Sequence, residues 1–100
     1  MAGFVQIIQY KTSNFEDMQK LADKFREQTE GRRTVARVMV CKDRDNAGQF
    51  MTIAEFPSYE AAMKNNDLPE TQEFSGAMMK LADGPPTFYN LDLERVEDLG

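Results

Sequence analysis

The pattern of apolar and polar residues divides the first half of the chain into strands and one helix. Residues 4–10 are rich in β-branched and aromatic side chains, which is typical of a strand. Apolar residues then recur every three or four positions over about residues 14–30, which predicts an amphipathic helix. Two further strands are predicted over 34–41 and 49–56, and the turn residues of 43–48 between them favour an antiparallel hairpin.

A second helical region follows the hairpin and is divided in two by polar residues. Ser58 is a suitable N-cap for the first piece, which the segment 65–67 interrupts. Asp67 is expected to cap the second piece, and Gly-Pro-Pro at 84–86 ends it. Residues 87–93 are predicted to form the fourth strand.

The order of these elements is βαβ-βαβ, which predicts an α+β, ferredoxin-like fold with a four-stranded antiparallel sheet and its helices on one face. We expect one domain over residues 1–100, ending in an acidic tail at 94–100 that has no core pattern of its own. The second and third strands are apolar on both faces, for example at Val38, Met39 and Val40. Because the helices cover only one face, the sequence predicts a homodimer through the helix-free face.

The composition narrows the functions that this chain can have. Its 100 residues carry a net charge of −5, include one cysteine and contain no histidine. Triads of the Ser-His-Asp kind and imidazole-ligated metals are therefore excluded, and no metal site is expected. Basic residues are interspersed with acids, which argues against nucleic-acid binding. No apolar run is long enough for a membrane span, and a single cysteine fits a reducing, cytoplasmic location.

Residues 52–62, Thr-Ile-Ala-Glu-Phe-Pro-Ser-Tyr-Glu-Ala-Ala, carry a family resemblance. In this context the chain resembles the antibiotic-biosynthesis-monooxygenase-like (ABM) group, whose members are dimeric α/β barrels. The resemblance implies a cofactor-independent oxygenase acting on small aromatic or quinol substrates. The histidine and tryptophan of the haem-degrading members are absent here. A non-catalytic protein that binds small molecules, or a dimeric interaction module, is the alternative.

Without histidine, any chemistry depends on amide, phenol and guanidinium groups. The candidate catalytic residues are Arg37, Asn65 and Tyr89. Arg37 either stabilises a deprotonated substrate or pairs with Glu55 on the adjacent strand. Asn65 or a tyrosine would position dioxygen or a carbonyl group of the substrate.

The candidate ligand-binding residues are aromatic, amide and methionine side chains. Tyrosines can donate a hydrogen bond to a quinone, although buried tyrosines commonly complete a core. Methionines suit adaptable apolar pockets and also pack in ordinary cores. The set is Tyr10, Tyr59, Asn66, Phe74 and Met78.

Overall fold

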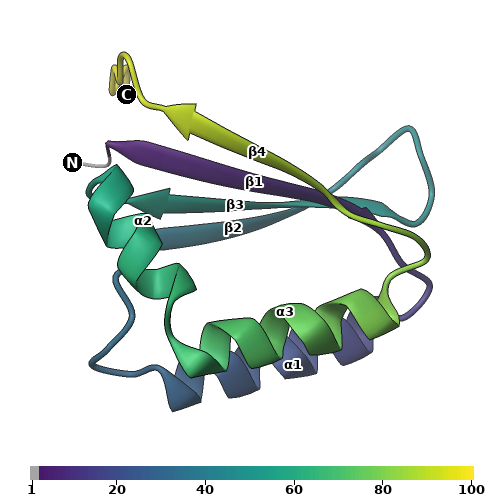
Figure 1. Ribbon diagram of the computed structural model, residues 1–100. Helices are drawn as coiled ribbons and strands as arrows, with labels where there is room; N and C mark the ends of the chain where they lie inside the picture. The colour runs from purple at the N-terminus through teal and green to yellow at the C-terminus, as the bar shows by residue number, and fades with distance from the viewer. Residues whose placement is uncertain (1–2) are drawn as a thin grey trace.

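The computed structural model describes residues 3–100 and contains one antiparallel sheet with three helices. The elements are β1 (Phe4–Lys11), α1 (Phe15–Gln28), β2 (Arg37–Lys42), β3 (Gln49–Phe56), α2 (Tyr59–Asn66), α3 (Pro69–Leu81) and β4 (Thr87–Asp92). The strand order is β2-β3-β1-β4, and the helices lie on one face of the sheet (Figure 1). The predicted α+β, ferredoxin-like fold is therefore confirmed.

The strand register decides which side chains share a face of the sheet. Ile8 on β1 lies opposite Thr52 on β3 and opposite Phe88 on β4. Successive side chains of a strand point to opposite faces, so even-numbered positions of β1 share one face and odd-numbered positions share the other. Phe4 and Tyr10 lie on the face that the helices cover, because both are buried there.

The buried core consists of two clusters on this helix face. The first joins Tyr10 and Phe50 of the sheet to Met18 of α1 and Met78 of α3. The second is built from Phe4, Phe56 and Ala62, which brings α2 against β1 and β3. α1 and α3 also pack on each other. The helical layer is therefore attached to the sheet at two places, and it does not fill the whole face.

The second strand begins at Arg37, three residues later than predicted. Thr34 is held by α2, because its backbone N–H donates to Asn65 Oδ1 at 3.2 Å and its hydroxyl donates to the Ala61 carbonyl. A residue that is bonded to a helix in this way cannot join the strand ladder at the same time. Its β propensity was therefore outweighed by a tertiary contact.

The cap predicted at Asp67 is wrong. Asp67 closes α2, and its N–H donates to the Met63 carbonyl at 3.1 Å. The N-cap of α3 is Leu68, which has no side-chain cap, and Pro69 occupies the first turn. The Ser58 cap of α2 is confirmed, because its hydroxyl accepts the Ala61 N–H at 3.0 Å.

The chain beyond β4 continues as an irregular segment. Leu93 N–H donates to the Gly3 carbonyl at 3.1 Å, which holds the start of this segment beside β1. Val96 and Leu99 are exposed, the latter at 88%. Among residues 3–100, no helix has both the length and the apolar character needed to cross a bilayer.

Candidate functional site

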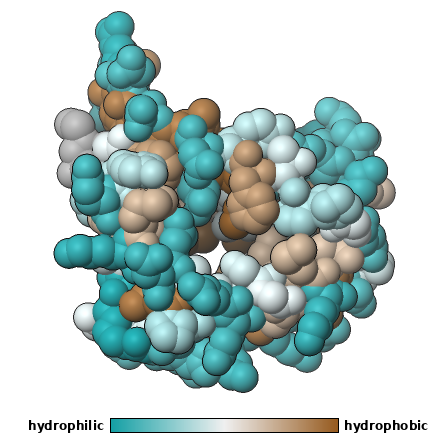
Figure 2. All heavy atoms as spheres, in the orientation of Figure 1, coloured by the Kyte–Doolittle hydropathy of each residue, from teal (hydrophilic) through white to brown (hydrophobic). Residues whose placement is uncertain are grey.

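A cavity of about 810 Å³ lies between the helix face of the sheet and the helices. Figure 2 shows the surface hollowed in this region. The cavity exists because the helices leave the edge strands uncovered, so Val38 of β2 and Phe88 of β4 are 51% and 53% exposed although both lie on the helix face. Most of the wall is apolar, and it includes Ile8, Phe25, Val38, Val40, Ala54, Phe74, Met78, Met79 and Phe88. A large apolar hollow with a few polar groups is the usual form of a small-molecule site.

Asn65 supplies the best-defined polar group of this wall. It lies in the last turn of α2 and is 6% exposed. Its Oδ1 accepts the Thr34 N–H at 3.2 Å, which fixes the side-chain amide. Within residues 3–100 its Nδ2 donates no hydrogen bond. Every fully buried side-chain nitrogen of the described residues has a hydrogen-bond partner. The Nδ2 group is therefore not fully buried, and Asn65 is one of the residues that line the cavity.

Tyr10 places a phenol at the sheet side of the same cavity. The residue is 4% exposed, and its hydroxyl lies 3.3 Å from Thr52 Oγ1, with either oxygen able to donate. The ring stacks on Phe50 with centroids 5.9 Å apart. This position gives a fixed hydroxyl pair, Tyr10 with Thr52, on a mostly apolar wall.

Six of the eight predicted site residues line this one cavity. Asn65 and Asn66 come from the end of α2, while Phe74 and Met78 come from successive turns of α3. Phe74 also packs against Phe25 of α1, with ring centroids 4.9 Å apart. The complete set is Tyr10, Arg37, Asn65, Asn66, Phe74 and Met78.

Arg37 borders the cavity, but its guanidinium is bonded to Glu55. The Nε–Oε2 distance is 2.6 Å and the Nη2–Oε1 distance is 3.0 Å, so the pair is bidentate. The two residues are opposite each other in the β2–β3 register, at positions whose side chains face away from the helices. The hydrogen bond from Arg37 lowers the pKa of the Glu55 carboxyl below its ordinary value. Of the two roles expected for Arg37, the structure shows the ion pair with Glu55.

The two remaining tyrosines lie outside the cavity wall. Tyr89 of β4 is on the helix-free face, where its hydroxyl donates to Gln9 Oε1 at 3.4 Å. Tyr59 begins α2 and meets the edge of the Phe4 ring, with centroids 5.4 Å apart, while its side chain stays 52% exposed.

Sequence reasoning missed several polar residues of the cavity, and Gln6 and Arg33 are two of them. Gln6 lies on the same face of β1 as Tyr10, and its Nε2 donates to Asn90 Oδ1 at 3.2 Å. The two-residue period from Tyr10 could have identified it. Arg33 lies in the segment between α1 and β2 and also lines the cavity. No local pattern marks Arg33, because its position depends on the contact between Thr34 and α2.

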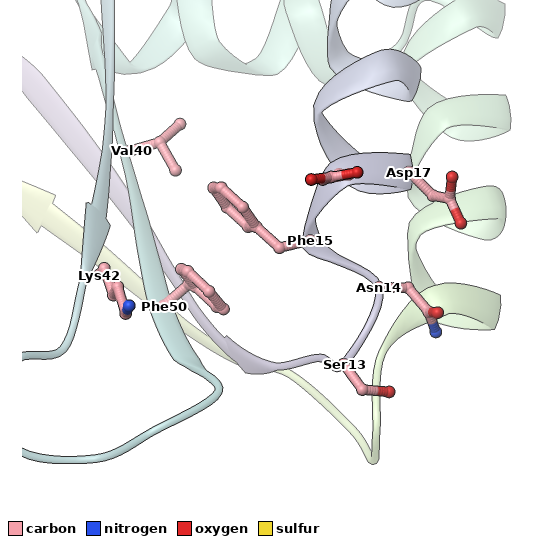
Figure 3. Close-up of a pocket in the computed structure, with 8 residues that line it drawn as sticks. Ser13, Asn14, Phe15, Asp17, Val40, Lys42 and Phe50 are labelled. Carbon is pink, nitrogen blue, oxygen red and sulfur yellow. The ribbon is translucent and has the colours of Figure 1, made fainter.

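A second recess of about 770 Å³ lies at the start of α1 (Figure 3). Phe15 and Phe50 stack there with centroids 4.2 Å apart, beside Val40 and Lys42 of β2. In the close-up Asp17 points away from this aromatic pair. The recess therefore offers an aromatic stack without a set of converging polar groups. Within the described part of the chain, no group of three or more Cys, Asp or Glu side chains could hold a metal ion.

Solved structures of other proteins share the fold of this chain. No protein-family model matches the sequence, and no curated protein matches it. Among solved structures, SnoaB from Streptomyces nogalater, a cofactor-independent oxygenase, has a TM-score of 0.80 at 9% identity, covering 96% of this chain and 97% of that chain. A protein from Caulobacter crescentus that is described as an antibiotic biosynthesis monooxygenase, without a demonstrated activity, has a TM-score of 0.77 at 12% identity and covers 94% of this chain and 92% of that chain.

A third solved structure, a conserved protein from Methanosarcina mazei, has a TM-score of 0.80 at 9% identity and covers 94% of this chain and 95% of that chain. At such low identities the likeness is one of fold, and function has to be argued from the site. The structure thus has the ABM-like fold that residues 52–62 indicated.

Proposed function

We propose that the protein is a cofactor-independent oxygenase that acts on small aromatic or quinol substrates in the cavity between sheet and helices. The observation that carries the proposal is the Asn65 amide, which lines a mostly apolar cavity and whose Nδ2 is neither hydrogen-bonded within residues 3–100 nor fully buried. The fold shared with SnoaB supports it. The cavity volume of about 810 Å³ is in the usual range for a site that encloses a small organic ligand.

The proposed chemistry uses the substrate as its own electron source. An ionised phenol or enol reduces dioxygen; in an anthrone, the CH₂ group and O₂ become C=O and H₂O, which balances atoms and electrons. In an apolar wall a hydrogen-bond donor stabilises an oxyanion more strongly than it does in water. Asn65 Nδ2 would donate to the substrate oxygen that carries the charge, and Tyr10 would orient the ring from the sheet side.

The direct test is oxygen uptake with a panel of anthrones and neutral hydroquinones. We expect uptake above the buffer rate for at least one compound, with a product that is heavier by 14 mass units for an anthrone. Uptake at the buffer rate across the panel would contradict catalysis. A raised melting temperature with the same compounds, without uptake, would instead support the non-catalytic binding protein.

We also propose that two copies of the chain pair through the helix-free face of the sheet. Tyr89 and Leu91 on this face are 42% and 45% exposed, which leaves an apolar surface in contact with water. In this arrangement the Arg37–Glu55 pair and Tyr89 would lie at the interface, apart from the chemistry. The apolar residues that the register places on this face are Val5, Ile7, Met39, Cys41, Met51, Ile53, Tyr89 and Leu91.

A further inference from the structure

Arg33 differs from the other arginines that border the cavity. Arg26 lies 3.7 Å from the Asp23 carboxylate, and Arg37 is bidentate to Glu55. Within residues 3–100, Arg33 has no carboxylate partner, and its guanidinium donates one hydrogen bond, from Nη1 to the Arg26 carbonyl at 2.6 Å. It is half-buried against the cavity wall. A chain with a net charge of −5 therefore keeps one uncompensated cation at its apolar cavity.

The position of Arg33 is fixed from both sides. Its own N–H donates to the Thr29 carbonyl at 2.9 Å, just after α1. The next residue, Thr34, donates its N–H to Asn65 Oδ1 at 3.2 Å. The backbone of Arg33 is thereby held beside the end of α2, at the part of the cavity where the Asn65 amide lies. The Arg33 backbone and the Asn65 amide thus lie at the same end of the cavity, and the guanidinium reaches back to the last turn of α1, where Nη1 donates to the Arg26 carbonyl.

The segment that carries Arg33 is also tied to α3. The guanidinium of the preceding residue, Arg32, is bidentate to Glu70, and one of these bonds, Nη1 to Oε1, measures 3.1 Å. Arg32 also donates to the Gln28 carbonyl at 2.7 Å. Arg32 is therefore already paired with a carboxylate. The guanidinium of Arg33 keeps N–H donors that form no hydrogen bond within residues 3–100.

We propose that Arg33 forms an anion-binding subsite of the cavity, so that the ligand is an aromatic acid whose carboxylate meets the Arg33 guanidinium. The inference rests on the proposed function in one respect, namely that the cavity takes an aromatic ligand. A guanidinium presents donors in a planar fork that matches a carboxylate, and charge-assisted hydrogen bonds are stronger than neutral ones. The apolar wall would hold the rings, and Asn65 would remain free to bond a ring oxygen.

Isothermal titration with 2-naphthoic acid and 2-naphthamide tests the subsite, since the two compounds differ in charge and little in shape. We expect the wild-type protein to bind the acid at least about tenfold more tightly than the amide, as befits a charge-assisted bond. Arg33→Gln should remove this preference, because it removes the charge that the carboxylate binds. The affinity for the uncharged amide should stay within about twofold of the wild-type value. Arg33→Lys, which keeps a point charge, should retain part of the preference.

Arg44→Gln is the matched control, because Arg44 is an exposed arginine in the β2–β3 loop and does not line the cavity. It should keep the full preference for the acid. Equal binding of acid and amide by the wild type would overturn the subsite, and so would a loss of both ligands in Arg33→Gln with an unchanged melting temperature. Failure of both compounds to bind would overturn it as well, whereas the oxygenase proposal is judged separately by uptake with neutral hydroquinones.

Discussion

The two faces of the sheet are built from the same strands and differ in their polar content. On the helix face, Asn65 and Tyr10 present fixed polar groups on an apolar wall with a cavity between them. On the opposite face, the middle of the surface around Ile7 and Ile53 is apolar, and the bidentate Arg37–Glu55 pair lies at one end of the β2–β3 register. Sparse converging polar groups in a hollow fit a small ligand, while a continuous apolar surface fits a protein partner.

The largest effect is expected from a charge placed in the middle of the helix-free face. Ile53 lies opposite Ile7 on β1 and opposite Met39 on β2, so it is central in the sheet. Ile53→Lys should weaken the dimer by about 100-fold or more, because the ammonium would be buried without a partner and the symmetry of a dimer repeats the change. Sedimentation velocity at micromolar concentration should then show a monomer of 11.4 kDa.

Gln28→Lys is the control, since it adds the same charge at the exposed end of α1. It should leave the dimer intact, and circular dichroism should show that both variants keep the fold. A wild-type protein that sediments as a monomer, or an Ile53→Lys variant that stays dimeric, would refute the proposed use of this face.

A smaller effect, confined to the helix face, is expected from Asn65→Asp. The variant keeps an oxygen that can accept the Thr34 N–H, and it removes the Nδ2 donors of a residue that lines the cavity. If Nδ2 stabilises a developing oxyanion, oxygen uptake should fall by about 100-fold, the loss typical of one such donor. The oligomeric state should not change, because Asn65 lies on the other side of the sheet from the proposed interface.

Asn14→Asp makes the same change of side chain at the start of α1, away from the cavity. Its oxygen uptake should match that of the wild type. Equal uptake in Asn65→Asp and the wild type would show that the amide is not part of the reaction, and the proposal would then lose the observation that carries it.

The smallest effect concerns the two bidentate ion pairs, one on each side of the sheet. Glu55 and Glu70 are 20% and 21% exposed in the single chain, and the arginine bonded to each lowers the pKa of its carboxyl. A lowered pKa in the folded state stabilises the fold above the ordinary pKa of 4.5, and this contribution is lost as the pH falls below that value.

Glu70→Gln should therefore lower the melting temperature by only about two degrees at pH 7, as for other exposed pairs, and by progressively less as the pH falls below 4.5. Glu55→Gln should behave in the same way in the monomeric Ile53→Lys background. In the wild-type dimer its effect should be larger and should depend on protein concentration, because a partner would cover Glu55. Equal effects of the two variants at every concentration would place Glu55 outside the interface.

Local sequence patterns predicted most of the fold. The strand over 49–56 was placed correctly because β-branched and aromatic residues lie between a turn cluster and a Pro-Ser cap. The Asp67 cap failed because α2 continued through Asn66 and used Asp67 for its own closure. β2 starts at Arg37, later than predicted, because Thr34 is hydrogen-bonded to Asn65 of α2. These two residues are 31 positions apart in the sequence.

The candidate site was predictable to the extent that it depends on residue type and period. Phe74 and Met78 line the cavity as their helical spacing suggested, and Tyr10 does so through its place on the strand. Arg37 and Tyr89 were chosen for their chemistry, yet the register directs their side chains to the helix-free face. Arg33 was missed because its chemistry depends on which carboxylates are already paired.

By itself the sequence determined the order of elements, the apolar character of both sheet faces and the absence of imidazole chemistry, since these depend on composition and short-range periodicity. Only the tertiary structure decided which face each polar side chain occupies, where the helices leave a cavity, and which arginine keeps free donors. Those outcomes depend on register and on competition between distant partners, such as Glu55 for Arg37 and Glu70 for Arg32, and short-range sequence does not encode them.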